Sequence, residues 1–80
     1  MEQVNFRLYA AARDAAGTSE ISIAPSSLEE LLREISRDNA RLSEVLERCS
    51  FLVDGAICHD RRIVISAGST VDVLPPFAGG

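Results

Sequence analysis

The sequence contains no lysine, so its eight positively charged residues are all arginines, and they face twelve aspartates and glutamates. The resulting net charge of −4 argues against a nucleic-acid backbone or an anionic membrane as the partner, because both are negatively charged surfaces. We therefore expect no nucleic-acid partner and no membrane partner. A partner with a basic or apolar docking face fits this composition better.

The residues that build most catalytic and metal sites are also scarce. There is one histidine, His59, and its neighbour Cys58 adds too little for a zinc site. The second cysteine, Cys49, is not in CxxC spacing with Cys58, and no Ser–His–Asp set or glycine-rich phosphate loop can be assembled. We expect free structural thiols, no metal site, no tightly bound cofactor and no catalytic machinery of the chain's own.

Long apolar runs are missing as well, so neither a signal peptide nor a membrane span is predicted. With the unpaired cysteines, this favours a reducing cytoplasm as the location. What the 80 residues do contain is 46% apolar side chains, enough for one small core. We expect a single domain over residues 1–80, with residues 75–80 as a protruding C-terminal tail.

Two segments near the N-terminus alternate with the period of a half-buried strand. In residues 4–10 the even positions are apolar, and residues 19–24 resume the pattern with Ile21 and Ile23 pointing inward. Between them, the Ala-rich stretch 10–17 predicts a turn or two of helix that ends at Gly17. The short connection favours an antiparallel pair, and Pro25 ends the second strand.

The strongest helix signal follows directly. Ser26 or Ser27 is a candidate N-cap, with Glu29 or Glu30 in capping-box spacing. One face of this helix is apolar, made by Leu28, Leu31, Leu32 and Ile35. Several carboxylates lie together on the other face. Their spacing from Arg33 and Arg37 is typical of ordinary surface ion pairs, so we favour that interpretation over acid–base chemistry or a metal site. A second short helix is predicted over residues 41–48.

The C-terminal half predicts further strands and turns. Residues 51–53 are an apolar run that leads into Asp54-Gly55, a strong hairpin signal, with a return strand over residues 56–59. A polar turn at 60–62, an apolar run at 63–65 that forms a short strand or turn, and a reversal at Gly68 precede the last strand over residues 71–74. This order predicts an α+β domain with the β-grasp, ubiquitin-like architecture: a mixed sheet of four to five strands, one main helix packed on one face, and one or two short helices.

The sheet's other face has no helix to cover it, which leaves apolar surface exposed near the tail. Leu74 faces away from Val71 and Val73, and residues 51–53 cannot all reach one core. With Phe77, such residues could form a docking patch. The pattern leaves open whether Phe51 and Leu74 belong to it.

The last seven residues, Leu74-Pro75-Pro76-Phe77-Ala78-Gly79-Gly80, are the candidate working part of the chain. Proline cannot donate to a sheet ladder, so the two prolines end the strand and start a stiff arm. Residues 77–80 reach about 13 Å, and the two glycines fit a narrow tunnel with an open terminal carbonyl. A carboxylate needs activation, for instance by ATP to an acyl adenylate, before a nucleophile displaces the leaving group. On the two glycines alone, a frayed end is the simpler interpretation.

Three stretches resemble a known family over nearly the whole chain. "FRLYAAARDAAGTSEISI", "FLVDGAI" and "GSTVDVLPPFAGG" are similar to the molybdopterin synthase small subunit of the MoaD/ThiS ubiquitin-like sulfur carriers. The Pro-Pro-x-x-Gly-Gly ending is the most specific part, since the thiamine-pathway carriers usually lack the two prolines. The stretch Gly68-Ser69-Thr70 departs from the family's Gly-Asp-acidic turn but keeps its glycine.

The resemblance implies a sulfur carrier. The β-grasp architecture predicted from the element order makes the first and last strands parallel neighbours in the centre of the sheet. An E1-like enzyme would use ATP to adenylate the Gly80 carboxylate, and a sulfurtransferase would help convert it to a thiocarboxylate. The tail, with Gly79, Ala78, Phe77, Pro76, Pro75 and Leu74 as its partner-binding residues, would enter the large subunit of a heterotetrameric molybdopterin synthase. There the sulfur would be donated to a cyclic pyranopterin precursor.

Three alternatives stay open. A carrier for thiazole or cysteine synthesis would share the tail chemistry and differ only in its acceptor. A ubiquitin-like modifier would form isopeptide bonds through Gly80, although a chain without lysine cannot build lysine-linked chains on itself. The third is an interaction module with an inert tail.

Overall fold

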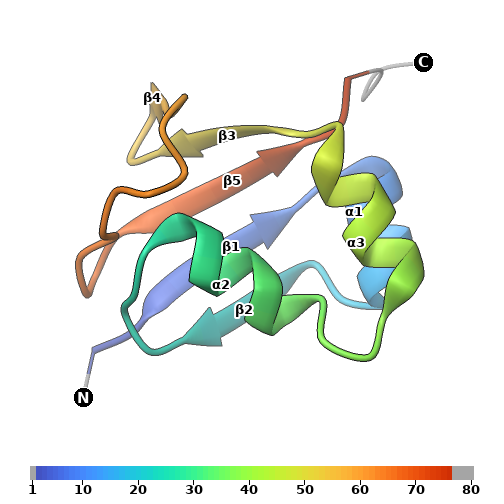
Figure 1. Ribbon diagram of the computed structural model, residues 1–80, viewed down its shortest axis with the longest axis horizontal. Helices are drawn as coiled ribbons and strands as arrows, with labels where there is room; N and C mark the ends of the chain where they lie inside the picture. The colour runs from blue at the N-terminus through green and yellow to red at the C-terminus, as the bar shows by residue number, and fades with distance from the viewer. Residues whose placement is uncertain (1, 77–80) are drawn as a thin grey trace.

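The computed structural model describes residues 2–76, and these form one five-stranded sheet with helices on one face (Figure 1). The strand order is β2-β1-β5-β3-β4. The strands are β1 (Val4–Leu8), β2 (Glu20–Ile23), β3 (Ser50–Val53), β4 (Ala56–Ile57) and β5 (Thr70–Leu74). Strands β1 and β5 are parallel neighbours in the centre, and the other pairs are antiparallel. The expected mixed sheet and its central parallel pair are confirmed.

Helix α1 (Ala10–Ala16) follows β1 almost without a connection. It ends at Gly17, whose φ of 78° is left-handed, as the sequence predicts. Its first residue corrects one expectation: alternation places Ala10 in the strand, whereas β1 stops at Leu8 and Ala10 opens the helix with φ +49°. The chain turns sharply at Ala10. The next side chain that points into the core is therefore Ala12, which is fully buried.

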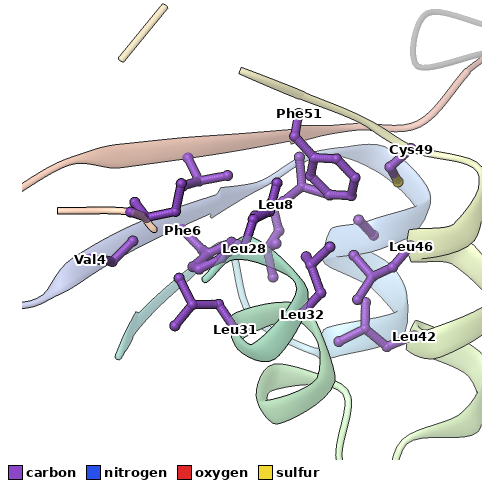
Figure 2. Close-up of a cluster of buried hydrophobic side chains, with 14 residues drawn as sticks. Val4, Phe6, Leu8, Leu28, Leu31, Leu32, Leu42, Leu46, Cys49 and Phe51 are labelled. Carbon is purple, nitrogen blue, oxygen red and sulfur yellow. The ribbon is translucent and has the colours of Figure 1, made fainter. Parts of the chain in front are cut away.

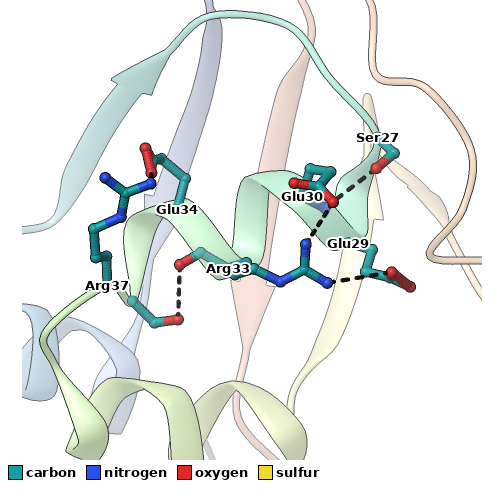
Figure 3. Close-up of polar contacts among 7 residues, drawn as sticks. Ser27, Glu29, Glu30, Arg33, Glu34 and Arg37 are labelled. Atoms are coloured by element: carbon teal, nitrogen blue, oxygen red, sulfur yellow. Dashed lines mark hydrogen bonds and ion pairs between the residues drawn. The ribbon is translucent and has the colours of Figure 1, made fainter.

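Helix α2 (Leu28–Ile35) is the main helix, and Ser27 is its N-cap. The Ser27 hydroxyl accepts a hydrogen bond from the Glu30 N–H at 3.2 Å, and the Glu30 carboxylate pairs with Arg33 (Figure 3). The surface pairs predicted at Glu29–Arg33 and Glu34–Arg37 both form. The carboxylates on this face are therefore held in surface ion pairs, as ordinary helix spacing suggests.

Helix α3 (Ala40–Glu47) begins one residue earlier than predicted, because Asn39 caps it. The Asn39 side chain accepts from the Leu42 N–H at 3.0 Å and donates to the Ala15 carbonyl at 3.0 Å. One amide thus caps α3 and ties it to α1. The two short helices lie together at one end of the sheet (Figure 1).

The hairpin after β3 turns at Asp54 and Gly55, whose φ values of 49° and 86° suit a type I′ turn. The predicted return strand 56–59 is too long, since β4 covers only Ala56–Ile57. The Cys58 backbone N–H donates to the Phe51 carbonyl. The chain then turns, and the Asp60 carboxylate accepts a hydrogen bond from the Arg62 N–H at 2.9 Å. Residues 61–65, beyond this turn, do not pair with β3.

Residues 61–65 then cross the start of α2 as a strap. The carbonyls of Arg61 and Ile63 accept the N–H groups of Glu29 and Leu28, the first residues of the helix. Among residues 2–76, a single β-bridge, between Ser27 and Val64, pairs this segment with another, so the apolar run 63–65 is not assigned as a strand. Ile65 is buried and Val64 is 72% exposed, so the strap anchors through Ile65.

Fourteen buried apolar side chains fill the space between the sheet and the helices (Figure 2). Val4, Phe6 and Leu8 come from β1 and Val71 and Val73 from β5, so both central strands alternate as predicted. Ile21 and Ile23 of β2 are partly buried against the same cluster. In the described part of the chain, no helix has the length and apolar character needed to span a membrane.

Candidate functional site

The root of the C-terminal tail lies at the edge of the sheet where β1 and β5 both end. Parallel strands have their carboxyl ends at the same edge of the sheet. Leu8 therefore pairs with Val73 close to the point where each strand ends. Strand β5 stops at Leu74, as the two prolines predict. Figure 1 shows the chain leaving at the end of the sheet opposite the N-terminus.

The two prolines differ in environment. Pro75 is buried and Pro76 is exposed, so the chain leaves the domain surface at Pro76, and Pro75 is part of the packed structure. The remaining candidate site residues, Phe77, Ala78, Gly79 and Gly80, lie outside the described residues. The structure therefore shows that the chain is packed as far as Pro75. By backbone dimensions alone, four fully extended residues would span about 13 Å.

An apolar patch lies on the open face of the sheet near this root. We define the open-face patch as Leu52, Ile57 and Leu74. Leu52 is directly opposite both Asp72 and Ile57 in the ladders, and Leu74 follows Asp72 by two residues, so the three share a face. Ile57 is 56% exposed, and Leu52 and Leu74 are half-buried.

Phe51 and Leu74, the two residues that the sequence leaves open as members of a docking patch, lie on opposite faces of the sheet. Leu74 lies on the open face, as its alternation predicts. Phe51 is opposite Val73 on the core face, is only 2% exposed, and has the Arg61 guanidinium 4.9 Å from its ring centroid. Phe51 is therefore a core residue and contributes nothing to a docking surface.

A bidentate ion pair borders the open-face patch. Arg7 of β1 donates from Nε and Nη2 to the two carboxylate oxygens of Asp72 in β5, at 2.6 and 3.0 Å. The hydrogen bond to Asp72 and its negative charge raise the pKa of Arg7. Tyr9, which follows Leu8 at the end of β1, is 38% exposed. The open face thus combines apolar side chains with a satisfied pair of charges.

Sequence reasoning missed Arg7, Tyr9 and Ile57 as members of this face. Their outward direction follows from alternation, but the Arg7–Asp72 pair depends on the register of two strands 65 residues apart. The sequence places Ile57 in a return strand but does not assign its face. Alternation is the signal for the outward direction of Arg7 and Tyr9, whereas the Arg7–Asp72 pair and the position of Ile57 opposite Leu52 depend on ladder register, which periodicity does not supply.

The residues that commonly carry catalysis are dispersed. Cys49 is buried, and this burial raises the pKa of its thiol, so it is a poor nucleophile at neutral pH. Cys58 is a free thiol whose Sγ lies 3.3 Å from the Asp60 carbonyl oxygen, and His59 is exposed beside it. Across residues 2–76, no three His, Cys, Asp or Glu side chains come together as a potential metal site.

Solved structures share this architecture at low sequence identity. The small archaeal modifier protein 1 of Methanosarcina acetivorans superposes with a TM-score of 0.82 at 21% identity, covering 100% of this chain and 98% of that one. The same modifier from Haloferax volcanii gives 0.80 at 18% identity, covering 98% and 99%. In a complex of subunits 1 and 2 of the molybdopterin-converting factor from Helicobacter pylori, a matching chain gives 0.73 at 23% identity, covering 98% and 99%.

Sequence comparison supplies the family. No curated protein matches the chain significantly. The ThiS family matches residues 6–80, which include the second half of β1, all of β5, all three helices and the Gly-Gly end. The chain therefore belongs to the ThiS family and has its ubiquitin-like, β-grasp sulfur-carrier fold.

Proposed function

We propose that this protein is the sulfur-carrying small subunit of a molybdopterin synthase. One observation carries the proposal: a ThiS-family domain ends in Pro-Pro-x-x-Gly-Gly, and its last strand delivers that ending to the edge of the sheet beside an exposed apolar patch. Pro75 is buried, so the chain is anchored to the domain immediately before its last residues.

The working group is the carboxylate of Gly80. An E1-like enzyme joins it to the α-phosphate of ATP, which forms an acyl adenylate and releases pyrophosphate. A sulfur nucleophile, supplied with the help of a sulfurtransferase, then displaces AMP, and the carbonyl becomes a thiocarboxylate. Glycine at position 80 leaves this carbonyl sterically open at each step. No cofactor is held by the carrier itself, and the ATP belongs to the activating enzyme.

The acceptor step takes place in a partner. The large subunit of the synthase takes up Phe77, Ala78, Gly79 and Gly80, and the sulfur passes to a cyclic pyranopterin precursor. The complex is a heterotetramer of small and large subunits. The open-face patch supports this proposal, because Ile57, Leu52 and Leu74 give the tail an adjacent apolar surface on which a partner can dock.

A second candidate is a ubiquitin-like protein modifier. The likeness to two small archaeal modifier proteins favours it, and the adenylate would be the same. The two functions diverge afterwards: a modifier transfers the Gly80 carbonyl to a lysine amine of another protein, whereas a carrier transfers sulfur. A sulfur carrier for thiazole or cysteine synthesis would differ only in the final acceptor.

Reconstitution with an E1-like enzyme, ATP and a sulfur donor tests the proposal. We compare the wild type with a variant lacking Gly80 and one extended by a single alanine. We expect both variants to retain the wild-type circular dichroism spectrum and melting temperature, because Gly80 lies beyond the packed Pro75, and to lose adenylation and sulfur transfer. Sulfur transfer by the Gly80 deletion would contradict the tail chemistry. Covalent conjugates on lysines of added proteins, without sulfur transfer, would favour the modifier.

A further inference from the structure

A groove runs beside the root of the tail, on the helical side of the domain. It has a volume of about 330 Å³ and lies between the start of α1, one face of α3 and the two prolines. We call it the tail-root groove. Its apolar floor and charged rim are made by Ala10, Val45, Pro75, Arg41, Glu44 and Arg48.

The side chains of α3 that line the groove lie on a different stripe of the helix from those that fill the core. Arg41, Glu44, Val45 and Arg48 are spaced i, i+3, i+4 and i+7, which is one stripe of a helix. The buried side chains of α3, Leu42 and Leu46, lie on the neighbouring stripe. Arg41, Glu44 and Arg48 are exposed and lie outside the core, whereas Val45 is half-buried and packs against its edge.

The floor is shaped for an apolar side chain. Pro75 is buried, Val45 and Ala10 are half-buried, and none of the three carries a polar side-chain atom. The turn that places Ala10 at the floor has φ +49°, a left-handed conformation that is uncommon for alanine. The tight passage from β1 into α1 thus brings small residues beside Pro75 and leaves the space open.

The rim is positive in an otherwise acidic chain. Arg41 and Arg48 lie about 10 Å apart along the helix, at the 1.5 Å rise per residue. Glu44 lies between them, three residues after Arg41 and four before Arg48, which is a spacing that allows ion pairs on a helix. Within the described residues, however, neither arginine forms an ion pair. The rim therefore carries one net positive charge, against −4 for the whole chain. This arrangement is complementary to an apolar side chain flanked by carboxylates.

Any protein that acts on the Gly80 carboxylate comes close to the tail-root groove. Four residues follow Pro76, so an enzyme that acts on the Gly80 carboxylate has its active site within about 13 Å of that proline. The surface around that active site must then lie against the root of the tail, and the groove is part of that root. Adenylation is the first step for a carrier and for a modifier alike.

We propose that the tail-root groove binds an acidic, apolar loop of the adenylating enzyme and that Arg41 and Arg48 are specificity-determining contacts for it. The inference rests on the proposed function, since it needs an enzyme that adenylates Gly80. Arg41 and Arg48 act on the encounter and the binding of the two proteins. They do not touch the reacting carboxylate.

Charge reversal at the rim tests this inference. The test variant is Arg41→Glu with Arg48→Glu, and the control is Arg37→Glu with Arg62→Glu, which makes the same change in net charge at arginines outside the groove whose side chains are 72% and 85% exposed. The readout is ATP–pyrophosphate exchange by the adenylating enzyme, with KM for the carrier and kcat measured at several salt concentrations.

We expect the groove variant to raise KM about tenfold at low salt, with kcat within twofold of the wild type. Its KM should also lose the increase with salt that the wild type shows, because the attractive charges are gone. The control should change KM less than threefold, and Arg41→Lys with Arg48→Lys should restore most of the wild-type KM. Melting temperatures measured in parallel show that each variant is folded.

Equal KM values for the groove variant and the control, or a lowered kcat with an unchanged KM, would overturn the groove proposal while leaving adenylation of Gly80 intact. A wild-type protein that supports no exchange at all would overturn both the groove proposal and the proposed function. A weakened complex with the synthase large subunit, with normal adenylation kinetics, would assign the groove to that partner and overturn the present proposal.

Discussion

Asp54 joins the β3–β4 turn to the start of β5. Its φ of 49° fits the first central position of a type I′ turn, where Asp and Asn are favoured. Its carboxylate accepts the Thr70 N–H at 2.9 Å, and its own N–H donates to the Thr70 carbonyl at 2.9 Å. Asp54-Gly55 predicts the hairpin turn from sequence. The hydrogen bonds to Thr70 join residues 16 positions apart, and no local sequence pattern predicts them.

The hydrogen bond from Thr70 and a second one from Ser69 lower the pKa of Asp54. A carboxylate with a lowered folded-state pKa stabilises the protein above its unfolded pKa of about 3.9, and this contribution is lost as the pH falls through the folded value. We expect Asp54→Asn, which keeps the turn preference, to lower the urea midpoint at pH 7. The difference from the wild type should shrink towards zero below about pH 3. A difference that stays constant over this range would contradict the role of the charge.

Helix α2 shows how local and distant groups together complete one element. Ser27 caps the Glu30 N–H, as its spacing predicts, but Glu30 binds Arg33 through its carboxylate. The N–H groups of Leu28 and Glu29 are accepted by the strap over residues 61–65, at 2.9 and 2.7 Å. The start and apolar face of α2 follow from sequence, whereas the strap cannot be predicted, because its contacts depend on tertiary packing and not on propensity.

Ser27→Ala should destabilise the protein by about 1 kcal/mol, the usual cost of losing an N-cap hydroxyl. The matched control is Ser26→Ala, because Ser26 contributes its backbone carbonyl to Ile65 and this bond survives the substitution. Urea unfolding at equilibrium measures both. Equal destabilisation by the two variants would show that Ser27 acts through something other than its cap.

At the scale of the whole molecule, the chain places its two faces in different roles. The core face is covered by three helices, and the open face carries Leu52, Ile57 and Leu74, of which Leu74 adjoins the tail root. Alternation predicts that Leu74 faces outward, and the β-grasp architecture inferred from the element order predicts the parallel pairing of β1 and β5. The register that brings Ile57 opposite Leu52, and the burial of Phe51, follow from strand pairing and stay out of reach of a period-2 pattern.

The two most exposed large apolar residues within positions 2–76 allow a matched test of this face. Ile57 belongs to the open-face patch, whereas Val64, 72% exposed, lies on the strap above α2. Ile57→Asp should weaken binding to the synthase large subunit about tenfold or more, because it places a charge in the docking surface. Val64→Asp should stay within about twofold, and both variants should keep the wild-type melting temperature. Isothermal titration calorimetry that finds the two variants equal would remove the patch from the interface.

The most direct test of the central claim is the intact mass of the protein purified gently from its own cells. The account predicts a species heavier than the calculated mass by the difference between one sulfur and one oxygen atom, with the change confined to the C-terminal peptide that ends in Gly80. An unmodified mass that persists after incubation with ATP, a sulfur donor and an E1-like enzyme would contradict the sulfur-carrier function.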